Sequence, residues 1–196
     1  MLIQPINKTG TPKMVNGLPV IMLDLTPKEM MQYDTILDIE KAFAMIFAQA
    51  LSYITKNVSI YAFNSATSTN IYKAETIESV SSFVSDSANR DGDFIRYIHS
   101  TLLESNAEMK YFYLITDGRP SADNYSGKDA LDDTLIAMRE VINSGIKLIY
   151  FNIDSQKQDY FDLFQKEATF ARHFQTPEDL LPVIPELVRT VVQSVS

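Results

Sequence analysis

The 196-residue sequence contains no cysteine, which excludes a disulfide framework and a thiolate metal site. It has no apolar run near the roughly 20 residues that cross a bilayer, and residues 1–8 show no signal-peptide pattern. Basic residues are few: 17 Lys and Arg stand against 25 Asp and Glu, a formal net charge of −8. Such a surface does not attract nucleic acid or anionic membranes. We therefore expect a cytoplasmic protein with no membrane insertion and no nucleic-acid partner.

Several catalytic signatures are also missing. The sequence has no glycine-rich phosphate loop, no serine nucleophile elbow and no zincin motif. Its two histidines, His99 and His173, have no nucleophile or metal-ligand partner at motif spacing, so we expect both to be structural. These absences favour a binding domain over an enzyme.

What the sequence does contain is an alternation of apolar strands and amphipathic helices. Strands are expected near 18–24, 58–63, 110–116 and 146–153, with a hairpin strand at 69–72 and a weak strand near 169–174. Helices are expected near 34–54, 91–103, 130–142 and 177–192, with a short one before the weak strand. This order predicts a three-layer, doubly wound α/β fold with a mainly parallel sheet flanked by helices. We expect a polar leader at 1–17 and a single domain at 18–196.

Two of the expected strands end at an aspartate. Asp24 closes the first strand and is followed by Thr26, and Asp117 comes directly after the strand at 110–116. Ligands of open parallel sheets lie beyond the carboxyl ends of the strands. Two carboxylates brought to that edge therefore indicate one site, most simply for a hard cation. The alternative is that each aspartate only caps a turn or a helix.

The order of these elements resembles a von Willebrand factor type A (VWA) domain. The shared features are Asp-x-Thr after the first strand, a long helix, a hairpin, a glycine at a helix start, and Thr-Asp-Gly after a later strand. The chain is more similar still to the VWA domains of nitric-oxide-reductase activation proteins (NorD type) and rubisco-activation proteins (CbbO type). This similarity is carried by residues 114–120, 125–127, 132–134, 149–154, 159–161 and 177–187.

The resemblance implies a metal-ion-dependent adhesion site. Such a site holds Mg²⁺ or Mn²⁺ with hydroxyl and carboxylate oxygens, and an acidic side chain of a partner completes the shell. The positions that match the family's ligands are Asp24, Thr26, Asn89 and Asp117. Ser87 is the alternative to Asn89 if the register differs by two residues. Arg119 lies on the rim of the expected site, where it could bind a partner's carboxylate or be a solvated surface arginine.

Lys28 stands where the family has a serine ligand, so the metal motif is degenerate. A protonated lysine offers no lone pair, and two cations ~4 Å apart repel by about 1 kcal/mol even in water. Two outcomes follow. Either Lys28 turns outward and a weak metal site remains, or its ammonium group lies between Asp24 and Asp117 and replaces the ion.

The resemblance also implies a non-enzymatic role in protein–protein interaction. In NorD- and CbbO-type systems the VWA protein links a MoxR-class AAA+ ATPase to a metalloenzyme, so an adaptor in metalloenzyme activation or complex assembly is expected. One alternative is an Mg²⁺-dependent phosphatase of the haloacid-dehalogenase type, although Thr26 stands where that family needs a second acidic residue. The other is a scaffold subunit with a vestigial metal site, which Lys28 and Asn89 favour.

Overall fold

The computed structural model of the chain describes residues 17–24, 33–65, 69–84, 88–153, 159–175, 179 and 182–193. A six-stranded sheet runs through it in the order β3-β2-β1-β4-β5-β6. The strands are β1 (Gly17–Asp24), β2 (Ser59–Ser65), β3 (Thr69–Lys73), β4 (Met109–Thr116), β5 (Lys147–Ile153) and β6 (Phe170–Phe174). β3 pairs antiparallel with β2, and the other neighbours are parallel. The predicted sheet and hairpin are therefore confirmed.

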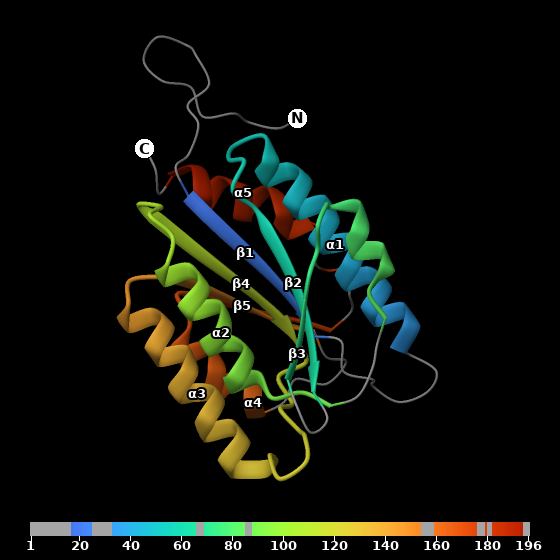
Figure 1. The fold of residues 1–196 in the computed structure, drawn as a ribbon, viewed down its shortest axis with the longest axis vertical. Coiled ribbons are helices and arrows are strands. Elements are labelled where there is room, and N and C mark those ends of the chain that lie inside the picture. Colours follow the sequence, from blue (N-terminus) through green and yellow to red (C-terminus); the bar gives the residue numbers. More distant parts are fainter. Residues whose placement is uncertain are drawn as a thin grey trace.

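Helices cover both faces of this sheet, as Figure 1 shows, so the predicted three-layer arrangement is confirmed. On one face lie α1 (Tyr33–Ser52) and α5 (Ile184–Gln193). On the other lie α2 (Asp91–Leu103), α3 (Gly127–Asn143) and α4 (Asp159–Phe164). Short 3₁₀ turns occur at η1 (Glu78–Ser82) and η2 (Gln165–Glu167). None of the described helices is long and apolar enough to cross a membrane.

The apolar sequence of β4 reflects its position between the two helical layers. Tyr111, Tyr113 and Ile115 pack in the core formed with α1 and α5. Phe112 and Leu114 point the other way, into the core formed with α2, α3 and α4. A strand covered on both faces has no position for a solvated side chain, so its sequence reads as a continuous apolar run.

The end of the chain differs from the prediction. The sequence predicts a helix from about 177, but residues 176–178 lie outside the described part of the chain. Pro182 and Val183 form a 3₁₀ turn, and α5 begins only at Ile184. Pro185 then occupies the first turn of α5, where its missing N–H costs no intrahelical hydrogen bond. The predicted leader at 1–17 also lies outside the described residues, except for Gly17, which begins β1.

The sheet order creates a switch point between β1 and β4. From β1 the chain moves outward through β2 and β3, then returns to place β4 on the other side of β1. The connections on the two sides of this point leave the sheet in opposite directions, so a crevice opens beyond the carboxyl ends of β1 and β4. Any ligand site of this fold is expected there.

Candidate functional site at the carboxyl edge of the sheet

The two strand-end aspartates lie at the same edge, in neighbouring strands. β1 ends at Asp24, β4 ends one residue before Asp117, and Leu23 pairs with Ile115 in the ladder between them. The predicted meeting of these two chain positions at the switch point is therefore observed for the backbone. The structure describes neither the side chain of Asp24 nor the residues Thr26 and Lys28.

Asp117 forms a tightly bonded turn directly after β4. Its side chain is buried, and its Oδ1 accepts a hydrogen bond from the backbone N–H of Arg119 at 3.0 Å. The backbone N–H of Gly118 donates to Thr116 Oγ1 at 3.1 Å, and Gly118 adopts a φ of +73°. Glycine is favoured here because a side chain is strained in the left-handed region. Arg119, the next residue of the turn, is exposed.

Asn89 joins this turn to the loop before α2. Its backbone N–H and C=O both bond Ser121, each at 3.0 Å, and its Oδ1 accepts a further hydrogen bond from the Ser121 N–H at 2.8 Å. Asn89 is fully buried. The two loops that the sequence assigned to one site are thus paired, and one lone pair of the Asn89 amide oxygen is already in use. Ser87, the alternative, lies outside the described residues.

A hydrogen-bonded network around Tyr125 holds the same two loops together from the helical side. Tyr125 Oη accepts a hydrogen bond from the N–H of Gly92 at 3.2 Å and donates one to Asp133 Oδ2 at 2.8 Å. The guanidinium of Arg90 lies 4.5 Å from the centre of the Tyr125 ring. Arg96 bonds Asp133 Oδ1 at 2.7 Å, which ties α2 to α3. No sequence pattern indicated this network, because its members are spread over more than 40 residues of chain.

The ionisation of this network follows from its packing. Burial raises the pKa of Tyr125 well above its ordinary value, and the neighbouring carboxylate of Asp133 raises it further, so the hydroxyl stays protonated and can donate. Burial alone would raise the pKa of Asp133. Hydrogen bonds from Arg96 and Tyr125 outweigh burial, and the pKa of Asp133 is lowered. The network therefore joins a neutral phenol to a charged carboxylate at neutral pH.

Asp91 is a carboxylate whose burial the sequence did not indicate. It begins α2 beside Asn89 and is only 1% exposed, whereas Asp93, two residues later, is exposed. A negative charge near a helix N-terminus is favourable on dipole grounds, and that explains its position. Dipole grounds do not require its burial, so no sequence pattern gave a reason to expect it.

His173 and Asn152 connect the Asp117 turn to the edge of the sheet. Asn152 Nδ2 donates to the Asp117 carbonyl at 2.7 Å, and Asn152 Oδ1 lies 2.6 Å from His173 Nδ1. An amide oxygen is only an acceptor, so His173 Nδ1 carries the proton. This contact agrees with the structural role expected for His173. Through Asn152 it links the Asp117 turn to β6.

The described donors do not form a metal site by themselves. Within the described ranges no group of three or more His, Cys, Asp or Glu side chains could hold a metal ion. Asp117 and Asn89 each already accept a backbone N–H. A divalent ion with hard oxygen ligands would need further donors, for which Asp24 and Thr26 are the sequence candidates.

Comparison with known proteins agrees with this architecture. No protein-family model matches the chain. It is 25% identical over 138 residues to protein NorD of Brucella abortus (strain 2308) and of Brucella melitensis, which is 64% of this chain. The match covers 22% of each NorD protein, so the chain spans about a fifth of the length of these curated relatives.

Solved structures show the fold. The vWF domain of the type V pili tip protein Mfa5 from Porphyromonas gingivalis aligns with a TM-score of 0.74 at 10% identity, over 93% of this chain and 97% of that one. A von Willebrand factor type A protein from Catenulispora acidiphila aligns with a TM-score of 0.65 at 14% identity, over 93% and 43%. The chain therefore has the fold of a von Willebrand factor type A domain and is distantly related to NorD over 64% of its length.

Proposed function

We propose that this chain is a non-enzymatic protein-binding domain that uses the carboxyl edge of its sheet, around Asp117 and Arg119, to bind a partner protein. The observation that carries the proposal is the pairing of Asn89 with Ser121, which holds the loop before α2 against the loop after β4. Loops that are already bonded to each other lose little conformational freedom when a partner binds. Arg119 is an exposed residue of this edge, and arginine is well suited to bind a carboxylate of a partner.

The distant relation to NorD supports a more specific role. We propose that the chain is an adaptor that binds a MoxR-class AAA+ ATPase and takes part in metalloenzyme activation or complex assembly. Domains of the VWA type are protein-binding modules, and the sequence of this chain contains no phosphate-binding loop of its own. In this proposal the motor lies outside this chain.

Replacement of Arg119 by alanine should weaken this interaction. We expect saturable binding of a purified MoxR-class ATPase from the same genome in isothermal titration calorimetry, and at least a tenfold weaker Kd for Arg119→Ala, because a charge-assisted contact is lost. Lys147→Ala is the matched control, since Lys147 is an exposed cation at the start of β5, where the amino ends of the strands lie, away from the proposed surface. If Arg119→Ala and Lys147→Ala weaken the binding of the ATPase equally, the partner does not bind at the surface that we propose. Phosphate release from an aryl phosphate with Mg²⁺, abolished by Asp24→Asn, would contradict the non-enzymatic role.

A second prediction concerns the degenerate metal motif. We propose that the ammonium of Lys28 takes the place of the ion, so the unmodified chain should show no saturable binding of Mg²⁺ or Mn²⁺ in calorimetry. Lys28→Ser restores a hydroxyl ligand and should bind Mn²⁺ measurably. Lys28→Ala is the control, because it removes the charge without supplying a ligand. Binding by the unmodified chain would show that Lys28 turns away, and binding by none of the three would point to a vestigial site.

A further inference from the structure

The outer face of α1 carries no charge over most of its length. Residues 42–55 contain no Asp, Glu, Lys or Arg. Part of this run faces the core, but Ala42, Ile46 and Gln49 are exposed, and so is Tyr53 in the turn that directly follows α1. Ile46 is 49% exposed and Tyr53 is 53% exposed. The outer face of a surface helix is normally charged or polar, and a helix that is apolar all round is normally covered.

These four exposed residues form a single stripe along the helix. They follow one another at spacings of four, three and four residues, which places them on one side of a helix with 3.6 residues per turn. The opposite side of α1 faces the sheet, where Phe47 is fully buried and packs edge-on against Tyr113 of β4. The stripe extends about 16 Å along the helix axis. We call Ala42, Ile46, Gln49 and Tyr53 the α1 stripe.

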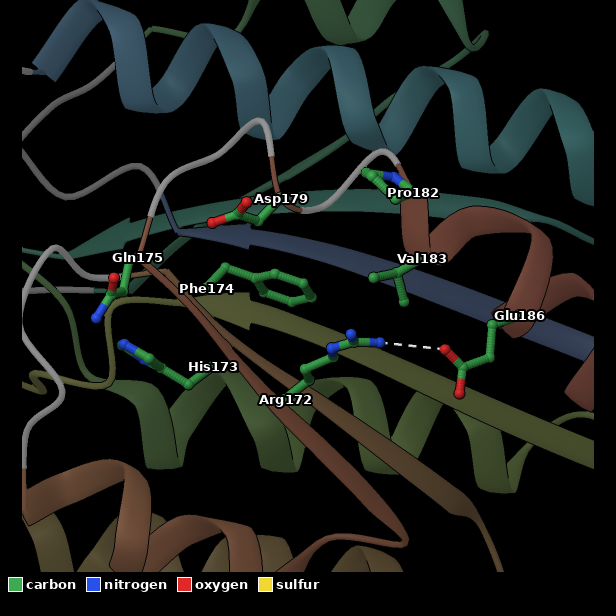
Figure 2. A pocket seen from close by; sticks show the side chains of 8 residues that line it. All are labelled: Arg172, His173, Phe174, Gln175, Asp179, Pro182, Val183 and Glu186. Atoms are coloured by element: carbon green, nitrogen blue, oxygen red, sulfur yellow. Dashed lines mark hydrogen bonds and ion pairs between the residues drawn. The ribbon is translucent and has the colours of Figure 1, made fainter.

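Two other exposed places differ from the α1 stripe because charged residues lie close by. Ile136 of α3 is 48% exposed, but Asp132 and Arg139 lie about one turn away on either side of it. A pocket of about 520 Å³ lies between β6, at the edge of the sheet, and the turn that leads into α5. An ion pair borders this pocket, with Arg172 Nη1 3.1 Å from Glu186 Oε2 (Figure 2). Charges suit both places to contact with water, whereas the α1 stripe has none.

The charges at the two ends of the stripe have opposite signs. Before it, three of the four charged residues in 34–41 are acidic, and after it the first charged residue is Lys56, which is exposed. Lys41 lies 3.5 Å from Asp38, yet the Asp38 side chain stays 68% exposed, so a further cation can reach it. Two copies of α1 in antiparallel order place Lys56 of each copy near Asp38 of the other, whereas parallel order opposes like charges. The stripe is therefore complementary to itself in the antiparallel direction.

The sizes of the stripe residues fit the same pairing. A two-fold axis between residues 47 and 48 places Ala42 opposite Tyr53 of the second copy, and Ile46 opposite Gln49. The smallest residue of the stripe thus meets the largest, so the tyrosine ring can cover the alanine where the two helices approach each other. The same axis brings Asp38 within one residue of Lys56. Charge and size therefore indicate one register.

We propose that the α1 stripe is the contact between two copies of this chain, which pair antiparallel about a two-fold axis between residues 47 and 48. Four residues are few beside the roughly 20–30 on each side of a standard interface, so the dimer is weak and forms at high protein concentration. An anionic membrane is a poorer occupant, because helices that lie on such membranes are rich in Lys and Arg, and this chain has a net charge of −8. The contact uses no residue of the carboxyl edge around Asp117 and Arg119, so it does not depend on the proposed function.

Sedimentation velocity of the chain between roughly 10 µM and 1 mM tests for the dimer. We expect the average mass to rise toward that of two copies as the concentration increases. Ile46→Glu places two carboxylates near the axis and should weaken the dimer at least tenfold. Ile136→Glu is the matched control, because Ile136 is 48% exposed but belongs to α3 on the other face of the sheet, and it should change the dimer Kd less than twofold. A chain that stays monomeric over the whole range, or equal weakening by both variants, would overturn the proposal.

Cysteine cross-linking tests the antiparallel order, and the chain has no cysteine of its own to interfere. Chains with Ala42→Cys are mixed with chains with Tyr53→Cys and oxidised. In the proposed pairing the two different cysteines meet, whereas two copies of either one lie about 16 Å apart along the helices, beyond the ~7 Å between Cα atoms that a disulfide can bridge. Mixed dimers should therefore form at least tenfold faster than either cross-linked homodimer. If the homodimers form as fast as the mixed dimers, the two copies do not pair in this order and the proposal is wrong.

Discussion

Gly118→Ala should lower the free energy of unfolding by about 3 kcal/mol. Gly118 has a φ of +73°, and a left-handed conformation costs a residue with a side chain roughly 1–2 kcal/mol. A Cβ at this position would also lie 2.5 Å from Tyr150 Oη and 3.1 Å from Asn152 Nδ2. The Tyr150 ring is stacked on Phe161 and fully buried, so it has little room to move. Overpacking of this kind adds about 1–3 kcal/mol.

Urea unfolding measures this loss, and Gly145→Ala is its control. Gly145 also has a positive φ, +85°, but no atom lies within 4 Å of the position a Cβ would take. Gly145→Ala should therefore lose only about 1–2 kcal/mol, the cost of the backbone conformation. The difference between the two variants isolates the collision with Tyr150 and Asn152. If both variants lose the same free energy of unfolding, Tyr150 and Asn152 move aside for the new Cβ at little cost, and the prediction is wrong.

Gly92→Ala should be the second large effect, with a loss of about 2 kcal/mol. A Cβ on Gly92 would lie 1.9 Å from Asp133 Oδ2 and 3.0 Å from Tyr125 Oη. The Asp133 carboxylate would have to leave its bonds to Arg96 and Tyr125, and the loss of partly buried charged hydrogen bonds costs about 1–3 kcal/mol. The expected loss arises from this displacement, because the φ of Gly92 does not lie in the left-handed region.

A second background tests the cause. Alanine is favoured over glycine within a helix by about 1 kcal/mol, so without the collision Gly92→Ala should cost little. In an Asp133→Ala chain the colliding carboxylate is absent, and we expect Gly92→Ala to be close to neutral. The double-mutant cycle is measured by urea unfolding, and a coupling of at least about 1 kcal/mol is expected. Equal losses in both backgrounds would show that Asp133 is not what makes glycine necessary at this position.

Local signals in the sequence were sufficient where one segment decides its own conformation. The strand at 110–116 was predicted from its continuous apolar run, and β4 spans Met109–Thr116. The helix near 130–142 was also predicted, and α3 spans Gly127–Asn143, with Gly145 at positive φ directly beyond its end. The last helix is present, but α5 begins at Ile184 and not at 177 as predicted. Two prolines, Pro177 and Pro185, both suit a helix start. Local pattern could not choose between them.

In the candidate site, too, some features follow from local sequence and others do not. The positions of Asp24 and Asp117 at one sheet edge followed from the two strands that precede them, and the register of β1 and β4 confirms it. The bond from Ser121 to the Asn89 amide oxygen could not be foreseen. Neither could the contact of Tyr125 with Gly92 and Asp133. Such contacts depend on how two loops meet after the helices have packed.

The sequence by itself determined the alternation of strands and helices, the parallel sheet and the sheet edge at which the strands before Asp24 and Asp117 end. Those features arise from apolar periodicity and from the direction of parallel strands, which are encoded within single segments. Only the tertiary structure decided that Asn89 is bonded to a neighbouring loop, that Asp91 is buried, and that β6 is an open edge beside a pocket. These depend on contacts between segments distant in the chain, because burial and hydrogen-bond partners are properties of the packed molecule and not of local sequence.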